Sequence, residues 1–257
     1  MKPPIDSIEA PPFPRDAEWL GSVPLEMGAL RGRAVLVEFW DCCRPHSLRT
    51  LPYLKEWYER YHGHGLTVVS VHSPGFAVSA DEANVRDTVE RLGIVHPVLL
   101  DSAFALWREY ENAGWPGRYL WGVDGMLVDY HYGEGAYEEC ELAIGEALAI
   151  AVEPMAPLRP EDAPGASVAP ASPDRLEPPF DGPYEAGAVW AVLDGRGVVH
   201  VNGREIDVAW PGAHLLIEHE RHGGGELELE PGGGVSVEAV CFTPGLDAAR
   251  APADRGR

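Results

Sequence analysis

The sequence predicts an α/β domain followed by a small all-β domain, on the basis of three observations. Over residues 18–152, short apolar runs that suit buried strands alternate with segments patterned as amphipathic helices. Residues 153–180 hold eight prolines and almost no apolar periodicity, which is typical of a semi-rigid linker. Over 181–246, short runs are separated by Asp-Gly, Asn-Gly, Pro-Gly and Gly-Gly turns, which predicts a sandwich or open barrel of small strands.

Composition and charge limit the partners that we expect. Of the 257 residues, 45% are apolar, which indicates a globular chain, and no apolar run approaches the roughly 18–20 residues that span a bilayer. The formal charge of −21 opposes binding to nucleic acid or to an anionic membrane. Residues 1–17 are Pro-rich, and we expect them to form a loosely held arm. They lack the apolar core of a secretory signal, so we expect a cytoplasmic protein. We expect residues 247–257 to form a frayed tail.

The α/β domain is organised around residues 34–61. Residues 34–40 form a short apolar run interrupted by one acid, which predicts a strand buried on both faces. Leucines and tyrosines then recur at helical spacing from Leu48 to Tyr61. The turn at 41–47 therefore lies at a helix N-terminus, where unpaired N–H groups and the helix dipole lower the pKa of a thiol.

The remaining pattern of this domain predicts a central mixed sheet flanked by helices. Crossover helices between strands imply parallel pairing, and Asp124-Gly125 between two apolar runs predicts an antiparallel hairpin. We expect strands at 66–72 and 97–101, and helices between 81 and 93, at 103–110 and at 138–152. In the second domain we expect strands at 188–193, 198–202, 205–208, 214–218, 226–230 and 235–242.

Several motifs carry a resemblance to a known family. Glu38, Trp40 and Pro52 stand at the offsets of the acid, the tryptophan and the helix proline of the thioredoxin-like (redoxin) superfamily. The stretches LRTLPYLKEWYERY, GLTVVSVHSPGF, WPGRYLWGVDG and HYGEGAYEE most resemble the thioredoxin-like domain of DipZ-type proteins. The resemblance covers about 18–150, and a weaker one over 184–245 is to their carbohydrate-binding-module-like β domain. It implies a thioredoxin-like domain followed by a small β-sandwich.

The family's two active-site cysteines are missing at the matching positions. By those offsets, the CxxC positions are occupied by Arg44 and Ser47, so we predict that ordinary dithiol activity is lost. In the family, a cis Trp-Pro bond faces this loop and guides an extended substrate peptide. The resemblance thus implies a binding groove formed by Trp40, Arg44, His46, Ser47, Trp115 and Pro116.

Two cysteines just before these positions have several interpretations. Cys43 could act as a displaced nucleophile, favoured as thiolate by Arg44 and the helix N-terminus, with Cys42 or an external thiol as resolver. Cys42 and Cys43 could instead form a vicinal disulfide, or hold a soft metal with His46 and with His72 as a fourth ligand. They could also be small residues that fill a turn.

Glu38 matches the family's buried acid, which accepts and returns protons during disulfide exchange. The other interpretation is a strand acid that hydrogen-bonds a neighbour or water. Cys140 and Cys241 lie in apolar-periodic segments and are predicted to be inert core residues. Trp190 and Trp210 could stack on sugar, but large aromatics in so small a domain more often fill its core.

Two functional hypotheses of different class follow. The first is a non-catalytic thioredoxin-fold protein whose groove binds a peptide or protein partner. The second is an oxidoreductase that acts on a thiol substrate through Cys43. The chain contains no Walker loop, dinucleotide fingerprint, nucleophile elbow or H-E-x-x-H motif, and we predict no cofactor.

Overall fold

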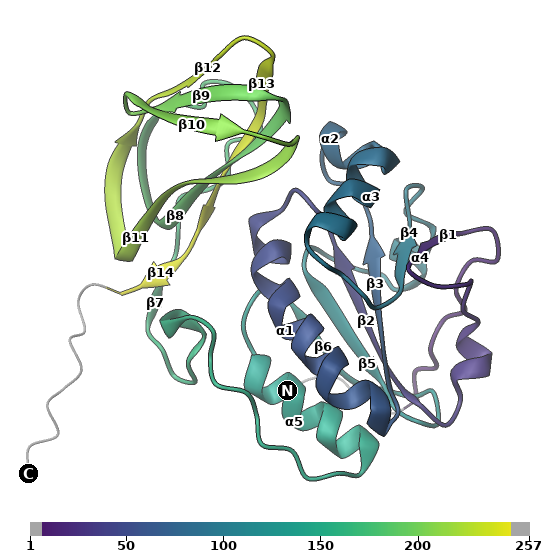
Figure 1. The fold of residues 1–257 in the computed structure, drawn as a ribbon. Coiled ribbons are helices and arrows are strands. Elements are labelled where there is room, and N and C mark those ends of the chain that lie inside the picture. The colour runs from purple at the N-terminus through teal and green to yellow at the C-terminus, as the bar shows by residue number, and fades with distance from the viewer. Residues whose placement is uncertain (1–6, 248–257) are drawn as a thin grey trace, which may run out of the picture. The chain divides into compact units, whose positions relative to one another are not determined.

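The computed structural model describes residues 7–247, which form two compact units (Figure 1). The described part of the first unit comprises residues 7–75 and 79–156, and that of the second comprises 76–78 and 157–247. Within the described residues, no helix combines the length and apolar character needed to cross a membrane. The predicted tail beyond residue 247 lies outside this range.

A six-stranded sheet forms the centre of the first unit, with strand order β1-β4-β3-β2-β5-β6. Strand β2 (Ala34–Trp40) is buried along its whole length, as its apolar run predicts. It pairs in parallel with β3 (Leu66–His72) and antiparallel with β5 (Gly117–Trp121). The remaining strands are β1 (Glu18–Leu20), β4 (Val98–Leu100) and β6 (Leu127–Tyr132).

Alternating side chains of β2 supply two separate cores, one on each face of the sheet. Leu36 packs with residues of α1 (Pro45–Tyr61) and α5 (Tyr137–Leu148), which cover one face (Figure 1). Val35 and Val37 pack on the other face with α4 (Ala105–Glu109) and the N-terminal segment. The other helices are α2 (Ala77–Ala80), α3 (Glu82–Arg91) and the 3-10 turns η1 (Met27–Leu30), η2 (His62–His64) and η3 (Pro160–Asp162).

The second unit is an all-β sandwich, which confirms the predicted fold class. One sheet has the order β11-β8-β13 and the other β10-β9-β12. Val189 and Val240 of the first sheet share a core with Val199 and Leu229 of the second. The strands are β8 (Gly182–Gly195), β9 (Gly197–Val201), β10 (Arg204–Val208), β11 (Gly212–Leu227), β12 (Leu229–Pro231) and β13 (Val235–Thr243), with the pair β7 (Val168–Ala169) and β14 (Gly245–Leu246) beside them.

The Pro-rich segment at 153–180 carries more hydrogen bonds than a free linker would. The Arg175 amide donates to the Val240 carbonyl at 2.8 Å, and the Val240 amide donates to the Arg175 carbonyl at 2.9 Å. The Ser172 amide donates to the Glu185 carbonyl at 2.7 Å. Non-proline residues between the prolines keep their backbone donors, and these pair with strands of the second unit. The boundaries at 152 and 181 stay a prediction.

Two other expectations differ in detail from the structure. The described part of the N-terminal arm is tied to the first unit, because the Ala10 amide donates to Gly125 at 3.0 Å and Phe13 is buried. The run at 226–230 does not form one strand, since β11 continues to Leu227 and β12 begins at Leu229. The chain changes sheets at this break, because β11 pairs with β8 as far as Leu227 whereas β12 pairs with β9 from Leu229.

Candidate functional site

The turn between β2 and α1 is the candidate site, and the sheet register determines its neighbours. The parallel pairing of β2 with β3 sets Trp40 opposite His72, so both strands end at the same edge. Trp40 is buried, with its ring edge-on to the His72 ring at 5.4 Å between centroids. Arg44 takes the N-cap position of α1 in an extended conformation, and Pro45 begins the helix.

Arg44 and Ser47 occupy the two positions where the resemblance implies thiols. The Arg44 guanidinium lies over the Trp115 ring, with its carbon 4.5 Å from the ring centroid. The indole Nε1 of Trp115 donates to the Ser73 carbonyl at 2.9 Å, and the Trp115–Pro116 bond is cis. Ser47 is buried, and its hydroxyl accepts a bond from the Asp41 amide at 3.2 Å.

Asp41 organises the turn, and the sequence analysis did not single it out. Its buried carboxylate accepts from the Cys43 amide at 2.7 Å and the Ser79 hydroxyl at 3.0 Å, and also from the Gly75 amide. A side chain at Gly75 would collide with this carboxylate and with Arg44. An aspartate directly after a buried strand and before a helix is the signal that could have revealed it.

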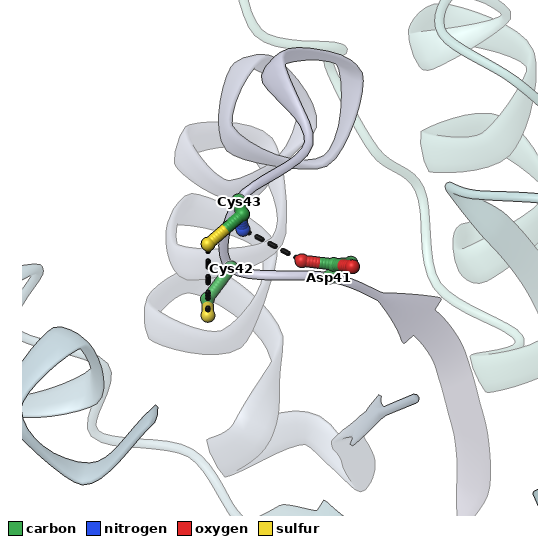
Figure 2. Close-up of side chains that lie close together, drawn as sticks. All are labelled: Asp41, Cys42 and Cys43. Atoms are coloured by element: carbon green, nitrogen blue, oxygen red, sulfur yellow. Dashed lines mark hydrogen bonds between the residues drawn. The ribbon is translucent and has the colours of Figure 1, made fainter. Parts of the chain in front are cut away.

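Two adjacent thiols lie beneath this turn (Figure 2). Cys42 is 3% and Cys43 1% exposed, and their Sγ atoms are 3.9 Å apart. No disulfide forms among the described residues. The hydrogen bond with Cys43 lowers the pKa of Cys42 to about 6, with help from His72 and against the effect of burial. Burial alone would lower the pKa of His72, yet Cys42 and Asp41 raise it.

Glu38 lies in the sheet beneath the turn. It is fully buried opposite Arg118 of β5, and the Ser70 hydroxyl donates to its carboxyl at 3.4 Å. Burial raises the pKa of Glu38 to about 8, although Arg118 and Ser70 lower it. The Ser70 hydroxyl also bonds His96 Nε2 at 2.8 Å, and burial lowers the pKa of His96 to about 4. The carboxyl thus keeps its proton at neutral pH.

The structure does not bring His46 to the thiols. Its Nδ1 lies 2.8 Å from Glu134 Oε1, and the same carboxylate accepts from Arg49 at 3.0 Å. Within the described residues, the only cluster that could hold a metal joins Asp41, Cys42 and Cys43. The metal hypothesis therefore loses His46 from its predicted ligand set.

The second unit holds the two tryptophans, Trp190 and Trp210, that the sequence analysis considered as sugar platforms. Trp190 and Trp210 are both half-buried, and the Trp210 ring stacks on His214 at 5.1 Å between centroids. His214 Nε2 is 2.8 Å from the Trp210 carbonyl oxygen, which fixes this pair locally. That these aromatics fill the core in preference to binding sugar stays a prediction.

Comparison with known proteins assigns the fold of the first unit. The chain matches no protein-family model. DipZ of Mycobacterium tuberculosis is 35% identical over 133 residues, which cover 51% of this chain and 19% of DipZ. A crystal structure of a thioredoxin-like superfamily protein aligns with a TM-score of 0.50 at 19% identity, over 57% of this chain and all of that one. The first unit therefore has a thioredoxin-like fold, and its similarity to DipZ supports the predicted resemblance to the thioredoxin-like superfamily.

Other thioredoxin-like relatives have names that specify an activity. The thiol-disulfide oxidoreductase YkuV of Bacillus subtilis is 24% identical over 139 residues, which cover 54% of this chain and 93% of YkuV. The chain spans about a fifth of the length of DipZ. The predicted superfamily and the thioredoxin-like fold of the first unit are confirmed.

Proposed function

We propose that the thioredoxin-like unit binds a segment of a partner protein at the face formed by Arg44 and Trp115, and that it exchanges no disulfides at positions 44 and 47. The contact of the Arg44 guanidinium with the Trp115 ring at 4.5 Å carries this proposal. Disulfide exchange requires an attacking thiolate, which a guanidinium cannot replace. Ser47 has no sulfur with which to resolve a mixed disulfide, and its buried hydroxyl accepts a bond from the Asp41 amide.

The Arg44–Trp115 face suits recognition of an extended peptide. Both side chains are half-buried, so each presents part of its surface while the rest is fixed by packing. Arginine and tryptophan are the residue types most enriched among binding hot spots. The cytoplasm is the proposed compartment, because the four cysteines form no disulfide among the described residues and a reducing environment keeps thiols in that state.

Selection of random displayed peptides on the full chain tests this function. We expect peptides that bind the wild type and lose at least about tenfold in affinity to Arg44→Glu and to Trp115→Leu, as for hot-spot residues. Arg86→Glu is the control, because Arg86 is an exposed arginine of α3 paired with Glu18. Peptides that bind all of these proteins equally would exclude this face as the binding site.

A second candidate is disulfide exchange by the inner thiol pair, Cys42 and Cys43. Their 3.9 Å separation and the nearby His72 favour it, with Cys42 in place of the predicted Cys43 as the attacking thiol. The Cys42 thiolate would attack a substrate disulfide, form a mixed disulfide and release one substrate thiol. Cys43 would then displace the second substrate thiol, leaving a Cys42–Cys43 disulfide that an external dithiol reduces.

Reaction with a small aromatic disulfide distinguishes the two candidates. The second candidate predicts fast release of thiol by the wild type, lost in Cys42→Ser and kept in Cys140→Ser, since Cys140 lies in α5. The first candidate predicts slow release by all three proteins, because both inner thiols are almost fully buried.

A further inference from the structure

A cavity in the first unit is lined by the β5–β6 hairpin, the end of α4 and the N-terminal segment. Its volume is about 520 Å³, within the range of about 300–1,000 Å³ that is typical of small-molecule sites. Of its eleven lining residues, five are aromatic and three are glutamates, and none of these described residues is basic. Neither Arg44 nor Trp115 lines the cavity, so this inference is independent of the proposed function.

The pairing of β5 with β6 gathers the aromatic rings on one face of the sheet. Tyr119 lies opposite Tyr130, and side chains two residues apart along a strand share a face, which adds Trp121 and Tyr132. The Tyr119 and Tyr132 rings meet edge to face at 6.0 Å between centroids, and their hydroxyl oxygens are 2.8 Å apart. Asn112 fixes this pair, because its Oδ1 accepts from the Tyr119 hydroxyl at 3.0 Å. The cavity therefore has a preformed aromatic wall.

Part of the cavity lining is open to solvent. Tyr132 is 41% exposed, and Ile8 of the N-terminal segment is 45% exposed. The Ile8 carbonyl accepts from the Leu127 amide at 2.9 Å, so the segment is held against the hairpin. The ordinary alternative is that the aromatic rings only complete the core, as the buried Tyr110 and Trp121 do. The exposed ring of Tyr132 instead offers a surface that a ligand can cover.

Three glutamates line the same cavity and give it negative charge. Glu9 comes from the N-terminal segment and lies 4.0 Å from Arg31, whereas Glu109 and Glu111 come from the end of α4. Among the described residues, neither Glu109 nor Glu111 has an ion-pair partner. Carboxylates and the faces of aromatic rings both attract cations, so the lining favours a positively charged ligand.

We propose that this cavity binds an aliphatic diamine or polyamine. Such amines carry their protons at neutral pH, as lysine does, and each ammonium group donates hydrogen bonds to carboxylates and tyrosine hydroxyls. The methylene segments between the charges suit the aromatic wall, because they bury apolar surface against it. Two or more charges match glutamates that come from two separate segments of the chain. Binding makes and breaks no covalent bond.

Calorimetric titration of the full chain with 1,4-diaminobutane tests the site, and we expect saturation at one molecule per chain. Tyr132→Leu should weaken binding at least about fivefold, and Tyr132→Phe, which keeps the ring, less than about twofold. Glu109→Gln combined with Glu111→Gln should weaken binding at least about tenfold, because two charged acceptors are lost. Glu82→Gln combined with Glu90→Gln, at two exposed positions of α3, is the matched control and should bind like the wild type.

Two measurements on the wild type require no variant, and circular dichroism checks the folding of each variant. 1-Butylamine, which has one charge, should bind at least about fivefold more weakly than the diamine. The ring currents of the aromatic wall should shift the methylene proton signals of the bound diamine upfield in NMR spectra.

Absence of saturable binding, absence of the upfield shift, or equal affinity for 1-butylamine would each overturn the proposal. An equal loss of affinity in the control variant would also overturn it, because it would indicate nonspecific attraction to a chain of charge −21. Failure of the peptide selection would leave these results unchanged.

Discussion

The outer and inner halves of one turn differ in chemistry although they are adjacent in sequence. In the outer half, Arg44 lies at the N-cap of α1 and covers Trp115. In the inner half, Cys42 and Cys43 are buried, and Cys42 interacts with His72 at the end of β3. The comparison teaches that a displacement of one or two residues moves thiols from a helix N-terminus into the interior. There, burial limits their access to large substrates.

Asp41 connects the two halves, and its removal should have the largest effect on stability. Asp41→Ala leaves the buried amide of Cys43 and the part-buried amide of Gly75 without their acceptor, and an unsatisfied buried group costs about 1–3 kcal/mol. We expect the free energy of unfolding in urea to fall by about 3 kcal/mol. Asp81→Ala is the control, because Asp81 caps α3 with one exposed bond to Ala83 and should cost about 1 kcal/mol. Equal losses for the two variants would contradict the role of Asp41.

Glu38, which lies in the sheet beneath the inner half, should make the free energy of unfolding depend on pH. Its pKa rises from the ordinary 4.5 to about 8 on folding, so the unfolded chain releases a proton that the folded protein keeps. The stability that this group contributes is therefore complete below pH 4.5 and is lost as the pH rises toward 8.

Glu38→Gln removes that loss. We expect the stability of the variant relative to wild type to increase by on the order of 2 kcal/mol between pH 5 and 7, measured by urea unfolding at each pH. Glu90→Gln, at an exposed position of α3, should show no such trend. A flat difference for Glu38→Gln would mean that the carboxyl is ionised in the folded protein.

The outer half should contribute least to stability. Arg44→Ala removes the cation–π contact with Trp115, worth about 0.5–1 kcal/mol at a partly exposed site. Thermal unfolding should show a correspondingly small loss, close to that of the surface variant Arg86→Ala. A larger loss of stability for Arg44→Ala than for Asp41→Ala would contradict the view that the outer half contributes least to stability.

Local sequence patterns predicted the frame of the site. The apolar run at 34–40 and the helical spacing after Leu48 correspond to β2 and α1, because strand and helix periods depend on neighbours within a few residues. The positions of Glu38 and Trp40 relative to the family pattern predicted the superfamily, and the comparisons support it.

Contacts between distant residues could not be predicted in this way. The turn pattern does not reveal the bonds from Asp41 to Gly75 and Ser79, which join segments more than thirty residues apart. His46 has a suitable side chain for a ligand, but the nearby Glu134 holds it elsewhere. The role of His72 depends on the parallel register of β2 and β3, which fixes it opposite Trp40.

The reduction of insulin disulfides tests most directly our central claim that the outer half has lost dithiol chemistry. We predict that the wild type stays near background. Arg44→Cys combined with Ser47→Cys should raise the rate at least about tenfold, because it restores an attacking and a resolving thiol at the helix N-terminus. The single variant Arg44→Cys is the control and should lack sustained turnover. Wild-type activity equal to that of the restored variant would contradict the claim.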